Sequence, residues 1–291
     1  MEQESQPGAV DRLCDVRVSG AEPAGSRVEP MDHIEVIRAE SRRFAEVLAH
    51  TAPDAPCPTC PDWTASDLLW HLVEVHEFWA SILETGATTD EQMQAIEDAK
   101  PQRPGTLAEM LAARERATER LCHQLARLSD REARWTWWPA DQTVGFTRRM
   151  QVCEATMHRV DAELAAGVRR TAISREVAVA LVNQCVDHMW AWIPDWSTQE
   201  MAGVVELLAA DTGQRWVVEV GHWTGVGPQS GKAFDVPCAR RAAPDAVSSA
   251  MAVAPVVDLA LWAWSRGGVV QRAGDEAVVK ALDAVIAEGV Q

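Results

Sequence analysis

The hydrophobic pattern between Met31 and Gly167 is typical of helices, because apolar side chains recur there every three to four residues. Helices are predicted at about residues 34–49, 64–84, 107–128 and 147–166. Thr64 and Asp67 have the spacing of a capping box, and Gly167 suits the left-handed turn that ends a helix. A polar connection that ends at Gly105 joins the second helix to the third. Four helices of this length predict a four-helix bundle.

The pattern changes after Gly167, where short runs of β type alternate with helices. Strands are predicted at 204–208, 215–220, 248–253 and 269–272, and helices at 174–192, 256–265 and 275–287. Mixed elements of this kind indicate a small α+β domain. The first 30 residues are rich in Gln, Ser, Gly, Pro and Glu and contain no apolar segment, which favours disorder. The predicted organisation is a disordered tail at 1–30, a mainly helical domain at 31–168 and an α+β domain at 169–291.

The composition narrows the class of partner. The chain of 291 residues carries a net charge of −16 and has a pI near 4.9, so nucleic acid and anionic membranes would repel it. No uninterrupted apolar run reaches the length of about 18 residues that a transmembrane helix needs. Seven cysteines without a secretory signal indicate a reducing cytoplasm and mostly buried thiols. A cytoplasmic protein that binds neither nucleic acid nor membrane is therefore expected.

Three polar residues fall on the predicted core faces of two helices. His71 lies three residues after Leu68 and four before Val75, within the apolar stripe of the second helix. Glu154 and His158 are four residues apart on the fourth helix and so share a face. Burying a carboxylate and two imidazoles is costly unless they form hydrogen bonds or bind a cation. Three such ligands are typical of a catalytic zinc site, because they leave one coordination position open.

The same residues also have a structural interpretation. His71 alone suits a core histidine bonded to a backbone carbonyl, and Glu154 with His158 suits an ordinary helical pair. Spacing along the chain does not show that the two helices touch. Asp161, three residues beyond His158, is a candidate to orient a ligand imidazole, and a structural bond to a neighbouring helix is the alternative.

Two segments around these residues resemble the motifs of a known family. Cys-Pro-Asp-Trp-Thr at 60–64, followed by Asp-Leu-Leu-Trp-His-Leu at 67–72, is similar to the N-terminal signature of the mycothiol-dependent maleylpyruvate isomerase family. Glu-Ala-Thr-Met-His-Arg-Val-Asp-Ala at 154–162 resembles the second metal motif of the same family, which is part of the DinB-like metalloenzymes. The resemblance implies a DinB-like bundle followed by a smaller module that resembles sterol-carrier proteins.

The resemblance also implies a set of site residues. The implied ligands of a divalent metal, most simply zinc, are His71, Glu154 and His158. Arg266 ends a helix as the functional arginine of the family does, and there it would bind the carboxylate of an anionic substrate. Ser265 stands before it where the family commonly has glycine.

The chemistry implied by the resemblance uses a borrowed thiol. The metal would ionise mycothiol, a low-molecular-weight thiol of certain bacteria that serves as cosubstrate or recycled cofactor, and the thiolate would attack a small electrophile. Thiol transfer and cis/trans isomerisation by reversible addition both remain open. The alternatives are a metal hydrolase that uses a bound water and a non-catalytic protein that binds metal or a small molecule.

Other conspicuous residues are interpreted as structural. Cys57 and Cys60 have the spacing of a redox or zinc pair, but no second pair occurs to complete a zinc site. His76 lies about 140° round the helix from His71, which predicts a contact with solvent or a neighbouring loop. Arg240 and Arg241 are expected to be solvated in a loop.

Overall fold

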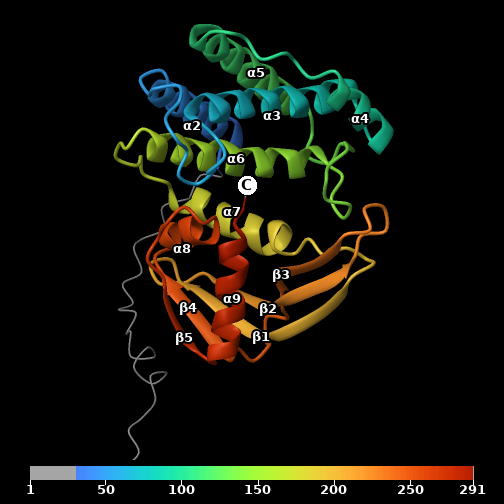
Figure 1. Ribbon diagram of the computed structural model, residues 1–291, viewed down its shortest axis with the longest axis vertical. Coiled ribbons are helices and arrows are strands. Elements are labelled where there is room, and N and C mark those ends of the chain that lie inside the picture. Colours follow the sequence, from blue (N-terminus) through green and yellow to red (C-terminus); the bar gives the residue numbers. More distant parts are fainter. Residues whose placement is uncertain (1–30, 291) are drawn as a thin grey trace, which may run out of the picture. The chain divides into compact units, whose positions relative to one another are not determined.

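The computed structural model describes residues 31–290, so the predicted tail at 1–30 lies outside the described residues. The described chain divides into two compact units, Met31–Leu181 and Val182–Val290. The first unit is helical and the second combines a sheet with helices (Figure 1). This order confirms the predicted fold class of a helical region followed by an α+β region.

Four long helices form the first unit, as predicted. They are α2 (His33–Leu48), α3 (Ala65–Thr85), α5 (Leu107–Arg127) and α6 (Val144–Ala165). Helix α3 packs mainly on α5 and α6, α2 packs mainly on α6 and α5, and α2 and α3 also touch each other. Their apolar stripes meet in a core where Phe44, Leu72 and Leu121 are fully buried. Each such side chain stabilises the fold by about 1.5–3 kcal/mol relative to an exposed one.

The helix ends follow the polar signals in the sequence. Thr64 and Asp67 form a reciprocal capping box at the start of α3, with Thr64 N donating to Asp67 Oδ2 over 2.9 Å. Gly167 has a φ of +63°, which a residue with a side chain rarely adopts. The predicted polar connection contains a short helix, α4 (Asp90–Asp98), capped by Thr89. None of its residues is buried, so it carries no apolar stripe that could have revealed it.

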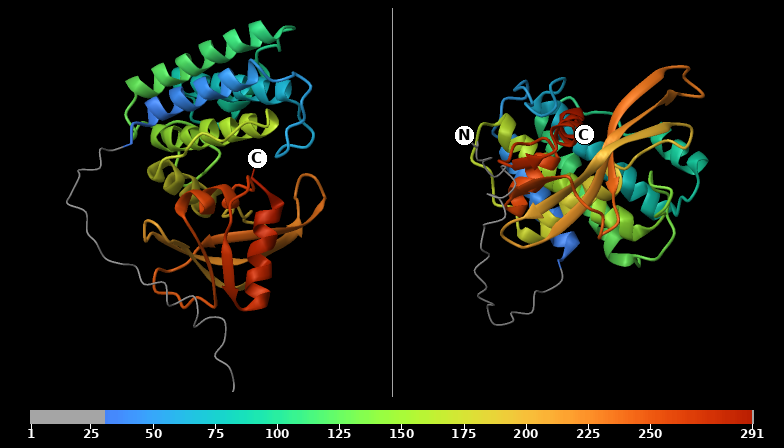
Figure 2. Two further views of the ribbon diagram at one scale, coloured as in Figure 1. Left: turned by 90° about the vertical axis from the view of Figure 1, so that its left-hand side faces the viewer. Right: turned by 90° about the horizontal axis from the view of Figure 1, so that it is seen from below.

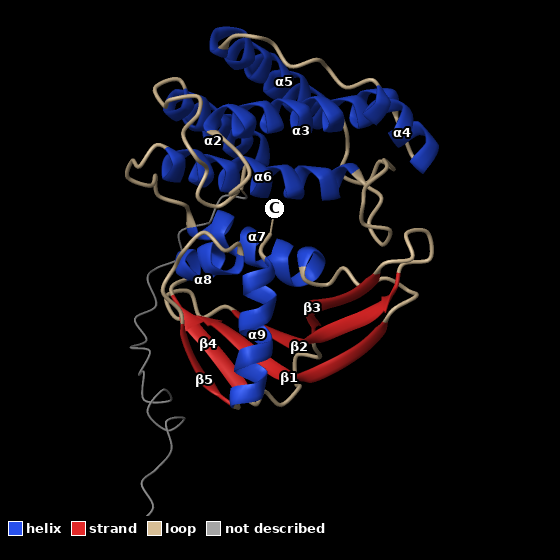
Figure 3. Cartoon of the chain, in the orientation of Figure 1, coloured by secondary structure: helices blue, strands red, loops and turns tan. Residues whose placement is uncertain are grey.

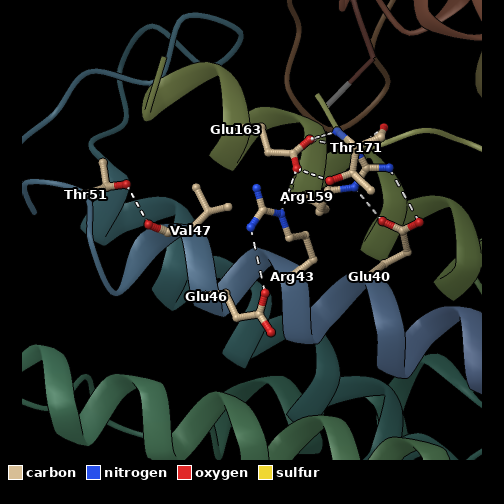
Figure 4. A network of polar contacts seen from close by, with 8 residues as sticks. All are labelled: Glu40, Arg43, Glu46, Val47, Thr51, Arg159, Glu163 and Thr171. Atoms are coloured by element: carbon tan, nitrogen blue, oxygen red, sulfur yellow. Dashed lines mark hydrogen bonds and ion pairs between the residues drawn. The ribbon is translucent and has the colours of Figure 1, made fainter. Parts of the chain in front are cut away.

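A buried network of ion pairs ties α6 to α2 and to the segment that follows α6 (Figure 4). Arg159 is fully buried, and its Nε donates to Glu40 Oε2 over 2.6 Å. Its Nη1 donates to Glu163 Oε2 over 2.8 Å. Glu163 also accepts hydrogen bonds from Thr171 Oγ1 and Arg43 Nε, so charges and hydrogen bonds are matched within the protein.

The helical unit extends further than the predicted boundary at residue 168. Thr171 is bonded to Glu163, and Cys153 Sγ lies 3.8 Å from the carbonyl oxygen of Ala180, so both anchor the next segment to α6. The border falls inside the predicted helix at 174–192, which the structure shows as α7 (Arg175–Gln184) followed by a π-helical turn, η1 (Cys185–Met189). A continuous helical pattern gives no sign of a border within it.

A mixed five-stranded sheet of order β3-β2-β1-β4-β5 forms the second unit. The strands are β1 (Thr198–Ala209), β2 (Arg215–Val226), β3 (Ala233–Arg241), β4 (Ala250–Ala254) and β5 (Gln271–Gly274). Strands β1 and β4 pair in parallel, and the other neighbours pair antiparallel. Helix α8 (Val256–Ala263) follows β4, and α9 (Glu276–Glu288) lies across the sheet (Figures 2 and 3).

Strand β3 was not predicted, and the two arginines expected in a loop lie at its end. Arg240 Nε donates to Glu219 Oε2 over 2.8 Å, and Arg241 Nε donates to Asp187 Oδ1 over 2.6 Å. The expectation of a loop is therefore wrong, whereas both side chains are exposed as expected and form ion pairs at the surface. Strand β3 is an edge strand whose first residues are exposed, so it lacks the alternation that marks a half-buried strand. Among residues 31–290, no helix combines the length and the apolar character needed to cross a membrane.

Candidate metal centre

The structure brings together the three residues singled out as metal ligands. His71 lies on α3, and Glu154 and His158 lie one turn apart on α6. One nitrogen or oxygen donor from each residue lies within 4.8 Å of the other two. The two imidazole rings have a centroid separation of 4.8 Å, and His158 Nε2 is 3.1 Å from Glu154 Oε2. Two helices of the bundle core therefore converge on one small polar cluster.

A second carboxylate holds His158 from the other side of its ring. His158 Nδ1 is 3.0 Å from Oδ2 of Asp161, which is fully buried. Because a carboxylate accepts hydrogen bonds, Nδ1–H donates to Asp161 and Nε2 is directed toward Glu154. The oxygen Oδ1 of Asp161 accepts a hydrogen bond of 2.6 Å from Thr59 Oγ1, in the loop before α3. Asp161 thus has the position of a residue that orients a ligand imidazole, and it also makes a structural bond.

The two imidazoles of the cluster have opposite electrostatic environments. Burial and then the positive charge of His158 lower the pKa of His71 to about 4, so this ring is neutral near pH 7. Burial would also lower the pKa of His158, but the hydrogen bonds with Asp161 and Glu154 outweigh it and raise that pKa to about 9. Burial would raise the pKa of Glu154, and the bond with His158 reverses this effect and lowers it.

The donor set fits a divalent metal such as zinc. Within residues 31–290, the ring nitrogens of His71 have no hydrogen-bond partner, although the ring is largely surrounded by protein. His158 Nε2 and Glu154 Oε2 lie 3.1 Å apart and belong to the same small group of donor atoms as His71. Two imidazole nitrogens and one carboxylate oxygen match the ligand class of catalytic zinc, with one position left for a further ligand.

The loop before α3 contributes two residues, Thr59 and Trp63, that helical periodicity does not mark. The ring of Trp63 lies 4.6 Å from that of His71 and 6.5 Å from that of His158, measured between centroids. Thr59 supports Asp161, as described above. Trp63 belongs to the recognised motif, which was the available signal, whereas nothing in the sequence marked Thr59.

The sequence also led to predictions for His76 and Arg266, and the outcomes of these two predictions differ. His76 is fully buried, and its Nδ1 is 2.9 Å from Thr118 Oγ1 on α5, so the predicted contact with solvent or a loop is wrong. His76 is not part of the three-residue cluster. Arg266 lies in the second unit, where its buried guanidinium donates to the carbonyl oxygens of Trp264 and Val290. Its role toward a substrate stays a prediction.

Comparisons with known proteins give a family match for the helical unit and a similar fold among solved structures. Residues 34–163 match the family model described as the mycothiol maleylpyruvate isomerase N-terminal domain. Two solved structures of the mycothiol-dependent maleylpyruvate isomerase, one of them of a mutant, are similar in fold with a TM-score of 0.54 each. They are 14% and 12% identical in sequence, and each match covers 84% of this chain and 93% of the other. No curated protein sequence matches the chain.

Proposed function

We propose that this protein is a metal-dependent enzyme that acts through a small thiol, because residues 34–163 belong to the mycothiol maleylpyruvate isomerase N-terminal domain family. It would activate mycothiol, or a similar thiol, for transfer to a small electrophile or for reversible addition onto one. The observation that carries the proposal is the convergence of His71, Glu154 and His158, whose donor atoms lie within 4.8 Å of one another. An ordinary helix pair requires no such convergence.

His71, Asp161 and Glu154 have different roles at this centre. A divalent metal, when bound, supplies the positive charge that favours the ionised, nucleophilic form of a thiol. His71 is neutral near pH 7 and offers its nitrogen lone pair without prior loss of a proton. Asp161 keeps a proton on His158 Nδ1, so that Nε2 is the nitrogen that faces the cluster. Glu154 adds the negative charge that offsets part of a dication's charge.

The proposed substrate is a small anionic electrophile. Arg266 would hold a carboxylate through two parallel hydrogen bonds, which a planar guanidinium forms well. This assignment rests on the family motif around α8, in which Arg266 lies three residues beyond the last residue of the helix, Ala263. Transfer and isomerisation share the same activation of the thiol, so they are distinguished by product.

The test combines metal content with product analysis. Purified protein supplied with zinc and mycothiol is offered a panel of electrophiles that includes maleylpyruvate, and products are identified by mass spectrometry. We expect thiol adducts or an isomerised product that require both metal and thiol. Turnover that needs metal but proceeds without any thiol would instead establish a hydrolase.

The variant His158→Ala tests the site itself. We expect it to remain folded and to lose bound zinc, measured by elemental analysis, together with the activity. His123→Ala is the matched control, because His123 is exposed on α5 and outside the cluster. Equal zinc in His158→Ala and the parent protein would refute the three-residue site.

A further inference from the structure

The loop that precedes α3 contacts the candidate metal centre at two points. Thr59 donates a hydrogen bond of 2.6 Å to Asp161, which in turn binds His158. Trp63 places its ring 4.6 Å from the ring of His71. The conformation of this short loop is therefore linked to both histidines of the centre.

The loop also contains two neighbouring thiols, on either side of Thr59. Cys57 and Cys60 are 1% and 2% exposed, and their side chains form a hydrogen bond with each other. The turn between them is closed by a bond of 3.1 Å from Cys60 N to Cys57 O. The thiols belong to the apolar core cluster of the bundle, and they lie at its edge, because the neighbouring Pro58 and Pro61 are exposed. Reaction of these thiols with an oxidant therefore requires a local opening of the turn.

The thiol of Cys57 differs chemically from the other cysteines of the bundle. The hydrogen bond from Cys60 outweighs burial and lowers the pKa of Cys57 to about 7. Burial raises the pKa of Cys122 to about 12 and also raises that of Cys153. A thiolate is the reactive form of cysteine, so Cys57 is the candidate nucleophile and Cys60 its resolving partner.

We propose that Cys57 and Cys60 form a reversible disulfide, and that its formation weakens metal binding at the cluster of His71, Glu154 and His158. The first half of the proposal concerns the thiols alone. The second half rests on the metal site of the proposed function. The sequence alone favoured a structural interpretation of this pair.

The oxidant is a small disulfide, and the reaction is two successive exchanges. The Cys57 thiolate attacks one sulfur of the small disulfide, forms a mixed disulfide with it and releases one small thiolate. The deprotonated sulfur of Cys60 then attacks the sulfur of Cys57, forms the bond within the protein and releases the second small thiolate. The two protons of the cysteines end on the two small thiols. The cysteine pair loses two electrons and the small disulfide gains them.

The link to the metal centre follows from the position of Thr59. A disulfide holds its sulfurs at about 2.05 Å, far closer than a thiol hydrogen bond does. Because Thr59 lies within the four-residue turn that would tighten, its hydroxyl moves relative to Asp161, which is anchored on α6. Hydrogen bonds between oxygens are lost beyond about 3 Å, so a small displacement releases Asp161. Loss of such outer contacts typically costs about 10–100-fold in metal affinity.

The experiment measures the disulfide and the metal affinity separately. The full-length protein is equilibrated with 2-hydroxyethyl disulfide and its thiol, and peptide mass spectrometry after alkylation locates any disulfide. Zinc affinity is then measured against a chromophoric chelator for the oxidised and the reduced protein. We expect a Cys57–Cys60 disulfide that returns to thiols on reduction, and an affinity for zinc about tenfold lower in the oxidised form.

Three variants distinguish the effect of the disulfide on zinc affinity from other causes of weak zinc binding. The double variant Cys57→Ser/Cys60→Ser should bind zinc like the reduced parent whether or not oxidant is present. Thr59→Val should bind zinc about tenfold more weakly even when reduced, with little further effect of oxidation, and Thr59→Ser should restore the parent behaviour. Weak zinc binding by the double variant in both conditions would mean that the thiols themselves hold the metal, which would overturn the proposed link.

The possible failures are distinguishable. Thiols that stay alkylatable at Cys57 and Cys60 under oxidant would overturn the redox proposal. A disulfide that forms without changing zinc affinity would overturn its link to the centre. A protein that binds no zinc in either state would refute the metal site of the proposed function, while the disulfide measurement would still decide the redox half.

Discussion

Two charged clusters meet on helix α6, where the adjacent residues His158 and Arg159 point to different neighbours. Arg159 binds Glu40 of α2 and Glu163 of its own helix (Figure 4). His158 instead faces His71 of α3 and lies against Glu154. The first cluster matches its buried guanidinium with carboxylates, whereas the second leaves the ring nitrogens of His71 without a hydrogen-bond partner in the described chain.

The difference in how completely the two clusters are paired indicates a different role for each of them. A buried charge is tolerated when hydrogen bonds and opposite charges compensate it, as around Arg159. An incompletely paired cluster is less favourable in the free protein, and a ligand can recover that free energy on binding. The Arg159 network therefore serves stability, whereas the cluster of His71, Glu154 and His158 could hold a metal ion. Variants on the two faces of α6 should separate these roles.

The largest effect is expected for Arg159→Ala. This change leaves Glu163 and Glu40 without their central partner in the bundle, and such losses cost about 3–5 kcal/mol of unfolding free energy. Urea denaturation followed by circular dichroism measures the loss. Arg38→Ala is the control, because Arg38 is partly exposed and paired with the exposed Glu119, where about 1 kcal/mol or less is expected. Equal losses in the two variants would contradict a special role for the buried network.

A pH-dependent effect of intermediate size is expected at His76, the other buried histidine of α3. Burial lowers its pKa from 6.5 to about 3, so the folded protein keeps this ring neutral. Below pH 6.5 the unfolded chain takes up a proton that the folded chain does not, and stability falls as the pH falls. The loss at pH 5 is about 2 kcal/mol, from 1.36 kcal/mol per pH unit.

The variant His76→Gln isolates this contribution. Its unfolding free energy, measured with chelator present, should fall by about 2 kcal/mol less than that of the parent between pH 7 and pH 5. His71 titrates in the same direction in both proteins and so cancels in the difference. Parallel pH profiles for parent and variant would show that His76 takes up its proton in the folded state.

Much of the fold could be predicted from the sequence because the four long helices carry continuous apolar stripes. Helices α3 and α6 also have polar signals at their ends, in the capping box of Thr64 and the left-handed Gly167. Helix α4 and strand β3 were missed for the same physical reason. Neither has a buried face with a regular period, so tertiary context and not local pattern determines them.

The candidate site was predictable only in part. Periodicity placed His71, Glu154 and His158 on inward faces, and family resemblance, not spacing, suggested that the faces meet. The contact of Thr59 with Asp161 spans 102 positions in sequence. A loop residue has no periodicity, and its partner depends on how the finished bundle packs, so no sequence pattern could have revealed this bond.

The smallest effect, on metal affinity, is expected for Asp161→Asn. This variant tests whether the carboxylate of Asp161 supports the metal cluster or the structural network of Arg159. The amide keeps the size of the side chain and can still accept from His158 Nδ1, but it removes the charge that makes the ring a better ligand. We expect zinc affinity to fall about tenfold, by chelator competition, with circular dichroism unchanged. Asp130→Asn is the control, because Asp130 is exposed and paired with Arg148. A large loss of stability in Asp161→Asn without a loss of zinc affinity would place Asp161 with the structural network of Arg159.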